Sequence, residues 1–230
     1  MNRFLGVVGI VLCATMARGT DVDDLIKQLK DGDSGARRAA ARDLGKGGVE
    51  SKSAVPALIR ALRTDKDLFV RRFSAQALGD IGPDAKSAIP ALTAALNDSK
   101  QEVQIAAAGA LGKLGPSGIE ALIGILKDGS KDPTMRRQAV DSLSHAGDGA
   151  HAAVPVLTAL VKGTAGKTRG KMAPEELRID AATALGSIAK ASDADTVAAL
   201  EALVEKQSKA PRGLKMAANQ ALRKIRSNNK

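Results

Sequence analysis

The stretch that decides the fold is VRRFSAQALGDIG, residues 70–82. Apolar or small side chains occupy its first, fifth, ninth and twelfth places: Val70, Ser74, Leu78 and Ile81. Steps of four, four and three residues put these side chains on one face of an α-helix. The stretch therefore predicts a helix that packs along that face, with Gly79 and Gly82 marking its end.

The same pattern recurs at five other places in the chain. The copies are ARRAAARDLGKGG from Ala36, VQIAAAGALGKLG from Val103, MRRQAVDSLSHAG from Met135, LRIDAATALGSIA from Leu177 and LKMAANQALRKIR from Leu214. Successive copies start 32 to 42 residues apart, the ninth place is always Leu, and the tenth is Gly in four copies. A regular spacing of this size is typical of repeat proteins.

A second amphipathic segment precedes each copy, as in PALIRALRT, where Leu58 and Leu62 stand four residues apart. In the first four units a short polar turn with an aspartate joins the two segments. A lone pair of such helices cannot bury both apolar faces, whereas stacked neighbours can. We expect one solenoid over residues 20–230, with units at about 22–48, 53–82, 86–115, 118–147, 151–189 and 195–226.

Composition agrees with an all-α chain. The 230 residues are 44% hydrophobic, enough for a packed core, but only three are aromatic and all of these are Phe. A core without large rings must be built from Ala, Leu, Ile and Val, and such side chains suit closely spaced helices. Alanine is also the residue with the highest helix propensity.

The pattern PALxxAL…D…VRxxAAxALGxIG resembles HEAT repeats of the short, lyase-type kind, over about residues 22–226. The resemblance implies a right-handed α-solenoid of about six helix pairs, with second helices lining the concave side. It also implies protein binding as the usual activity. The third copy departs from the pattern with Gln104 and Ile105, and the last copy replaces its glycines by Arg223 and Arg226, which indicates a terminal capping unit.

Two columns of arginine run through the copies. The resemblance implies that the second-place cation pairs with a turn aspartate of its own or the adjacent unit, giving a structural ladder. Its members would be Arg37, Arg71, Arg136 and Arg178 with Asp31, Asp65, Asp98 and Asp128. Third-place residues point about 100° further round the helix. Arg38, Arg72 and Arg137 are therefore the candidates for partner contact on the concave face, with a simply solvated surface as the alternative.

The chain begins MNRFLGVVGIVLCATMARGT, with Arg3, an apolar run and small residues at a cleavage spacing. This pattern predicts a secretory signal peptide over residues 1–19 and an exported protein, periplasmic or extracellular. The run is too short to span a bilayer, so no transmembrane segment is expected after cleavage, although retention as an anchor stays open. Cys13 is the only cysteine, which excludes disulfides and thiolate metal sites from the mature chain.

Positive charge concentrates at one end of the chain. The net charge is +10, and residues 206–230 hold eight Lys or Arg and no Asp or Glu. Two lengthened interhelix loops, of the fifth and sixth units, should lie side by side along one edge of the solenoid. We expect one anion-binding patch formed by Lys167, Arg169, Lys171, Lys206, Lys209 and Arg212. The alternative function is therefore docking on anionic envelope polymers or lipid headgroups.

Catalytic chemistry finds little support in the residues. His145 and His151 flank a turn beside Asp148 without a third ligand or a nucleophile, so we expect solvated turn residues. Glycine-rich GKGG and LGDIG follow no strand and match no nucleotide fingerprint. Phe69 and Phe73 are expected to be buried, which leaves no stacking platform for nucleic acid. We expect a non-enzymatic scaffold for a protein partner, possessing no cofactor or metal, with a lyase-type enzyme accessory as a minor alternative.

Overall fold

The computed structural model describes residues 21–165 and 173–227, and every regular element in these two ranges is a helix. The expected signal peptide and the loop residues Lys167, Arg169 and Lys171 lie outside the described residues. The α-helices are α1 (Val22–Asp31), α2 (Ser34–Lys46), α3 (Val55–Thr64), α4 (Leu68–Ile81), α5 (Ile89–Ala95), α6 (Gln101–Lys113), α7 (Pro116–Lys127), α8 (Pro133–Ala146), α9 (Val154–Lys162), α10 (Glu175–Ile188), α11 (Ala194–Val204) and α12 (Arg212–Ser227).

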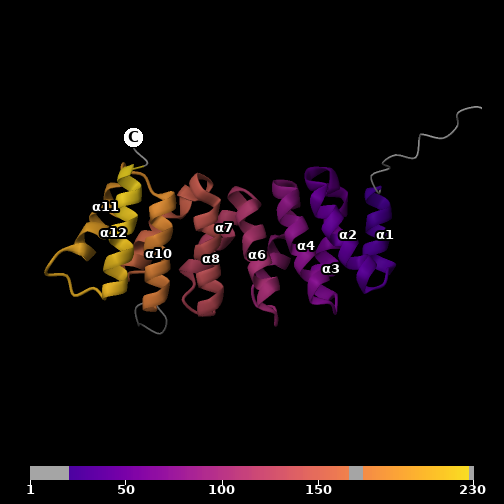
Figure 1. Cartoon of the computed structure of the whole chain (residues 1–230), viewed down its shortest axis with the longest axis horizontal. Coiled ribbons are helices and arrows are strands. Elements are labelled where there is room, and N and C mark those ends of the chain that lie inside the picture. Colours follow the sequence, from indigo (N-terminus) through magenta and orange to yellow (C-terminus); the bar gives the residue numbers. More distant parts are fainter. Residues whose placement is uncertain (1–20, 166–172, 228–230) are drawn as a thin grey trace, which may run out of the picture.

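The helices form antiparallel pairs that stack along one long axis, with α1 at one end and α12 at the other (Figure 1). The even-numbered helices pack closely against one another from α2 to α12, whereas the odd-numbered helices touch their counterparts far less. The even-numbered helices are the second helices of the pairs, which are predicted from the sequence to line the concave side. We call the surface of the even-numbered helices the inner face. The predicted all-α solenoid of helix pairs is confirmed.

Local sequence sets where the helices begin and end. Asp33, Asp67 and Asp132 stand directly before α2, α4 and α8, and each carboxylate accepts N–H groups of the first turn. Gly82 and Gly147 follow α4 and α8 with φ of 76° and 55°, a conformation that favours glycine. They turn the chain into the 3₁₀ segments η2 (Gly82–Ala88) and η3 (Gly147–Ala153); η1 (Gly48–Ala54) holds the same place after α2.

A single core runs through the stack. Val70, Ser74 and Leu78 are fully buried and Ile81 is 3% exposed, as the opening stretch predicts. The ninth-place leucines of all six copies are buried: Leu44, Leu78, Leu111, Leu143, Leu185 and Leu222. The cluster of buried side chains extends without interruption from Leu25 to Ile225, so each unit completes its core with its neighbours.

The tenth-place glycines do not end their helices, which corrects the interpretation of Gly79. Each lies inside its helix and faces the eighth place of the next copy. A Cβ on Gly79 would lie 2.8 Å from Cα of Ala110, and one on Gly186 would lie 2.9 Å from Cα of Ala221. Glycine is thus required because successive inner helices approach almost backbone to backbone. Gly82, by contrast, does end α4 as predicted.

The last copy breaks this rule where no further unit follows in the described residues. Arg223 holds the tenth place and is exposed on α12, whose other face buries Leu214, Ala218 and Ile225. An arginine at this place does not leave the space that glycine gives on α4 and α10, so another helix could not approach α12 as closely there. This supports the interpretation of the last copy as a cap.

Replacing Gly79 by alanine tests the close approach. We expect Gly79→Ala to lower the free energy of unfolding by about 1–3 kcal/mol, since overpacking outweighs the gain in helix propensity. Gly109 is the matched control, because nothing lies within 4 Å of the Cβ it would carry. Gly109→Ala should raise the free energy of unfolding by about 0.5–1 kcal/mol. Urea unfolding followed by circular dichroism measures both, and a stabilised Gly79→Ala protein would contradict the assignment.

Candidate functional site

The second-place side chain of every copy closes its own interhelix turn. Each donates a hydrogen bond to a backbone carbonyl at the end of the first helix or in the turn. The pairs are Arg37 with Gly32 (3.0 Å), Arg71 with Asp65 (2.9 Å), Gln104 with Asp98 (2.6 Å), Arg136 with Leu126 (3.3 Å), Arg178 with Val161 (2.8 Å) and Lys215 with Ser208 (2.6 Å). Carbonyls at helix ends lack intrahelical partners, so Gln104, although it breaks the arginine pattern, performs the same role.

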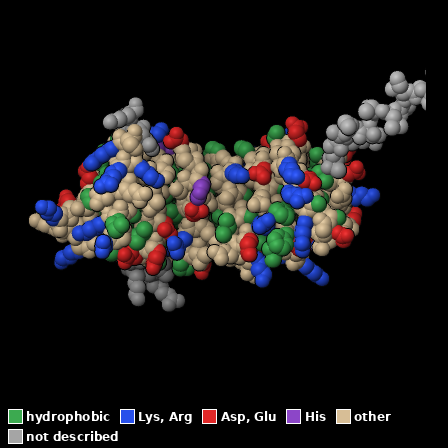
Figure 2. Space-filling model, viewed as in Figure 1, with side chains coloured by type: hydrophobic (Ala, Val, Ile, Leu, Met, Phe, Trp, Pro, Cys, Tyr) green, Lys and Arg blue, Asp and Glu red, His purple; other side chains and the backbone are tan. Residues whose placement is uncertain are grey.

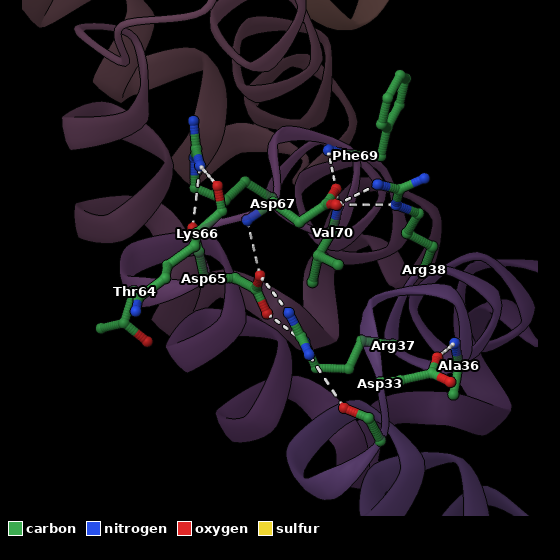
Figure 3. Close-up of polar contacts among 12 residues, drawn as sticks. Asp33, Ala36, Arg37, Arg38, Thr64, Asp65, Lys66, Asp67, Phe69 and Val70 are labelled. Carbon is green, nitrogen blue, oxygen red and sulfur yellow. Dashed lines mark hydrogen bonds and ion pairs between the residues drawn. The ribbon is translucent and has the colours of Figure 1, made fainter.

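Two of these arginines also bridge to the next unit, as the ladder predicts. Arg37 donates from Nε and Nη2 to the carboxylate of Asp65, at 2.7 and 3.0 Å, as Figure 3 shows. Arg71 forms the same fork with Asp98, at 2.8 and 2.9 Å. Each fork fixes the angle between adjacent units, because both nitrogens must meet both oxygens.

The other predicted ladder members form no such pair. Asp31 is exposed and forms no ion pair among the described residues, and Asp128 instead contacts Ser130 and Lys131 of its own turn. Arg136 and Arg178 also meet no carboxylate in the part of the chain that the structure describes. The ladder prediction is therefore wrong at these four positions. A fork needs an arginine in one unit and an aspartate in the next turn, and only the first two junctions supply both.

Burial disfavours the charged form of these aspartates and arginines, whereas ion pairs and hydrogen bonds favour it, and the balance decides the direction of each pKa shift. Burial works against the charge of Asp65 and Asp98, but hydrogen bonds from Arg37 or Arg71 and from backbone N–H groups outweigh it, so both pKa values lie below the ordinary value. Arg136 is only 1% exposed and has no carboxylate contact, so burial lowers its pKa. Its Nε has no hydrogen-bond partner among the described residues. Arg136 is thus an incompletely compensated buried cation.

Two of the three arginines predicted to contact a partner are engaged within the molecule. Arg38 donates from Nε to Asp67 at 2.9 Å, and Asp67 also caps the N-terminus of α4 (Figure 3). Arg137 donates from Nε to Asp180 on α10 at 2.6 Å. Both pairs link an inner helix to the next one, so these arginines serve the stacking of units as well as the surface.

Arg72 differs from its counterparts because no carboxylate meets it among the described residues. Its guanidinium carbon lies 5.3 Å from the ring centre of Phe69 and 4.6 Å from that of Phe73, within cation–π range. Arg38 approaches the same Phe69 ring at 4.9 Å. Phe69 is 38% exposed, so the expectation that both rings are buried is wrong for Phe69.

Ile105 is the surface residue that the search for charged groups missed. It occupies the third place, where three other copies have arginine, and it is 54% exposed. It lines a groove of about 370 Å³ between α6 and α8, together with Gln138 and His145. The sequence marks Ile105 as a departure from the arginine pattern but does not show that its side chain is exposed beside a groove.

Comparison with known proteins identifies the repeat. A family model described as HEAT repeats matches residues 22–101 and 89–173. The chain belongs to the HEAT-repeat family. No curated protein sequence matches it.

Solved structures share the HEAT-like architecture at low identity. One from work on microtubule plus-end tracking by XMAP215, CLIP-170 and EB1 is 17% identical, with 86% of this chain and 90% of that chain covered and a TM-score of 0.57. An engineered protein is 27% identical over 90% and 97% of the chains, with a TM-score of 0.49. The CpcE–CpcF complex of phycocyanin lyase from Nostoc is 22% identical over 98% and 99%, with a TM-score of 0.43. These likenesses concern the fold alone.

The two histidines contact different residues and do not share a partner. His145 on α8 is exposed, with Nδ1 2.8 Å from the carbonyl oxygen of Asp141. His151 in η3 places Nε2 3.2 Å from Asp193, in the turn before α11, a link between the last two units that sequence spacing does not reveal. Among the described residues no three His, Cys, Asp or Glu side chains gather as metal ligands.

The predicted basic patch is described only in part. Lys206, Lys209 and Arg212 are exposed around the loop between α11 and α12 and form no ion pair within the described ranges. Arg226, on the last turn of α12, pairs with Glu201 at 2.7 Å. No helix in the described ranges has the length and apolar content needed to cross a membrane.

The forks make stability depend on acid pH. In the unfolded chain an aspartate titrates near about pH 3.9, and the folded pKa values of Asp65 and Asp98 are lower. As the pH falls, the unfolded chain therefore takes up protons before the folded protein does. The stabilisation by the forks is fully present above the unfolded pKa and is lost as the pH falls through the lower folded pKa. Asp65→Asn/Asp98→Asn should melt lower than wild type at neutral pH, and the difference should shrink below about pH 4. Thermal melts across pH test this; Asp84→Asn, an exposed control, should follow wild type throughout.

Replacing a second-place arginine by methionine should lower stability at Arg71 but not at Arg136. Arg71→Met breaks a half-buried fork and leaves Asp98 uncompensated, which we expect to cost about 2–4 kcal/mol. Arg136→Met removes a buried cation without a carboxylate, so the melting temperature should not fall. Equal losses in the two melting temperatures would show that Arg136 is compensated as well as Arg71.

Proposed function

We propose that the protein is a non-enzymatic HEAT-repeat scaffold, in the cell envelope or outside the cell, that binds a protein partner on its inner face. The observation that carries the proposal is the distribution of exposed large apolar side chains. Within the described ranges these are Val49, Phe69, Ile105 and Met216, and all but Val49 lie near the N-terminal ends of inner helices. Three separate units thus each present an apolar side chain on the inner face, near the end where the inner helices begin.

Arginines interleave with these apolar groups along the inner face. Arg38 and Arg72 flank Phe69, and Arg137 and Ile105 line a hollow of about 440 Å³ across α6, α8 and α10. Figure 2 shows hydrophobic side chains gathered over α4 with basic ones beside them. Aromatic residues, methionine and arginine are the types enriched at the centres of protein interfaces. This composition favours a protein surface as the ligand.

The geometry supports a binding role better than a catalytic one. The grooves on the inner face are open and run between helices, and the two histidines stand in separate contacts with Asp141 and Asp193. General acid–base chemistry needs groups that converge on one reacting atom. A repeat surface instead spreads its contacts over several units.

Site-specific photo-crosslinking tests the inner face as the binding surface. Ile105→benzoylphenylalanine carries the probe on α6, and Glu120→benzoylphenylalanine carries it on α7 in the outer row as the matched control. We expect one discrete protein to crosslink at position 105 in the native compartment and not at position 120. Amino-terminal sequencing of the same purified protein should start at Thr20. Equal crosslinking at both positions, or none at position 105, would contradict the proposal.

A further inference from the structure

The junction between the second and third units lacks one link that a neighbouring junction has. At the first junction the third-place Arg38 is paired with Asp67, the residue directly before α4. The equivalent residue before α6 is Lys100, whose side chain makes no capping bond. Lys100 therefore occupies the place in the third unit that corresponds to Asp67, the acceptor of Arg38, in the second. The second unit thus has the third-place arginine, Arg72, but a lysine stands where the carboxylate acceptor would be.

Aromatic rings hold this unpaired guanidinium in place. Arg72 lies over both Phe69 and Phe73, whose ring centres are 6.4 Å apart. Its Nε is buried without a hydrogen-bond partner among the described residues, while the side chain as a whole is only half-buried. The stem of Arg72 is thus fixed against the rings, and its terminal nitrogens, which form no hydrogen bond within the described ranges, remain for a ligand. A guanidinium so ordered loses little entropy when it binds a carboxylate.

A groove of about 290 Å³ lies between α2 and α4, and Phe73, the neighbour of Arg72 in the chain, is one of its lining residues. Arg42, Lys46 and Lys113 line it, with Asp80 the carboxylate among its lining residues. Lys113 is paired with Asp80, and both Lys46 and Arg42 contact Asp43. Three cations thus face two carboxylates, and this excess of one positive charge adds to the unpaired Arg72 in favouring an acidic chain segment.

We propose that the inner face around α4 binds an acidic peptide segment of the partner, and that Arg72 receives one of its carboxylates. The inference rests on the proposed function, because it gives the chemistry of a partner that docks on the inner face. A carboxylate accepts two parallel N–H groups from a guanidinium, which gives both strength and orientation. The groove beside Phe73 then holds the apolar and further acidic side chains of the segment.

The surroundings favour a peptide over nucleic acid. Arg38 and Arg72 both contact the Phe69 ring, so that ring is not free to stack on a base. Asp43, Asp67 and Asp80 are interspersed among the cations, and a phosphate backbone with a charge at every residue would meet these carboxylates. A peptide can space its acidic groups to avoid them.

The test measures fluorescence polarisation of a fluorescein-labelled peptide of alternating Glu and Leu, with full-length protein at low salt. A Gln/Leu peptide of the same length is the ligand control. Arg72→Gln should weaken binding of the Glu peptide about tenfold, the loss expected for a charge-assisted bidentate pair. Arg72→Lys should recover only part of this loss, because lysine cannot form the fork. Arg63→Gln, which removes an exposed cation from α3 in the outer row, should bind like wild type.

The outcomes separate this inference from the proposed scaffold role. Equal binding of Glu and Gln peptides, or equal affinity of Arg72→Gln and Arg63→Gln, overturns the acidic-peptide site, even if position 105 still crosslinks a partner. Arg72-dependent peptide binding without a crosslink at position 105 supports this site and overturns the broader inner-face surface. A single-stranded DNA oligonucleotide that binds through Arg72 more tightly than the Glu peptide would also overturn the inference. Circular dichroism of each variant confirms that a loss is not unfolding.

Discussion

The close approach of successive inner helices is the constraint on which the structure depends. At the approach of α4 to α6 and of α10 to α12, a glycine backbone lies directly against the alanine of the next helix. The inner helices are accordingly in more extensive contact with one another than the outer helices are. Contact is less extensive between α6 and α8, although Gly112 faces Ser142 there, and between α8 and α10, where the fourth copy has Ser144. At the α4–α6 and α10–α12 contacts, the close approach of the inner helices depends on the absence of a side chain at the tenth place of the repeat.

A second layer of interactions fixes how the units are turned relative to one another. Second-place side chains satisfy the carbonyls of their own turns in every copy, and this local role tolerates Arg, Gln or Lys. Bridging to the next unit is more demanding, because it needs a fork on one side and a carboxylate on the other. The first two junctions have this arrangement, and the later ones use other contacts, such as Arg137 with Asp180 and His151 with Asp193. The N-terminal half of the array is consequently tied by half-buried forks that do not occur in the described part of the C-terminal half.

The fold was predictable because its determinants repeat, whereas the site was predictable only in part. Six aligned copies reveal the buried face that includes Leu78, and burial of that face follows from helix geometry alone. The role of Gly79 could not be inferred, since a glycine near a helix end has the same local pattern whether it stops the helix or admits a neighbour. The predicted ion pairs of the ladder were wrong for a related reason. Arg136 has the same place in its unit as Arg71, and the difference is that the next interhelix turn supplies an aspartate only to Arg71. Exposure of Phe69 depends on how neighbouring units pack, which a single copy of the repeat does not reveal.

Departures from a repeat acquire meaning only when the regular contact is known. A lone arginine on a surface helix is ordinarily solvated and carries no information. Arg72 is informative because its counterpart Arg38 has an acceptor at Asp67, and because Lys100 replaces that acceptor one unit later. With the cation in place over two aromatic rings and no acceptor at Lys100, Arg72 carries a positive charge that no described residue pairs. In a stack held together by complementary junctions, a charge left without a complement is the place where an external group of opposite charge gains most by binding.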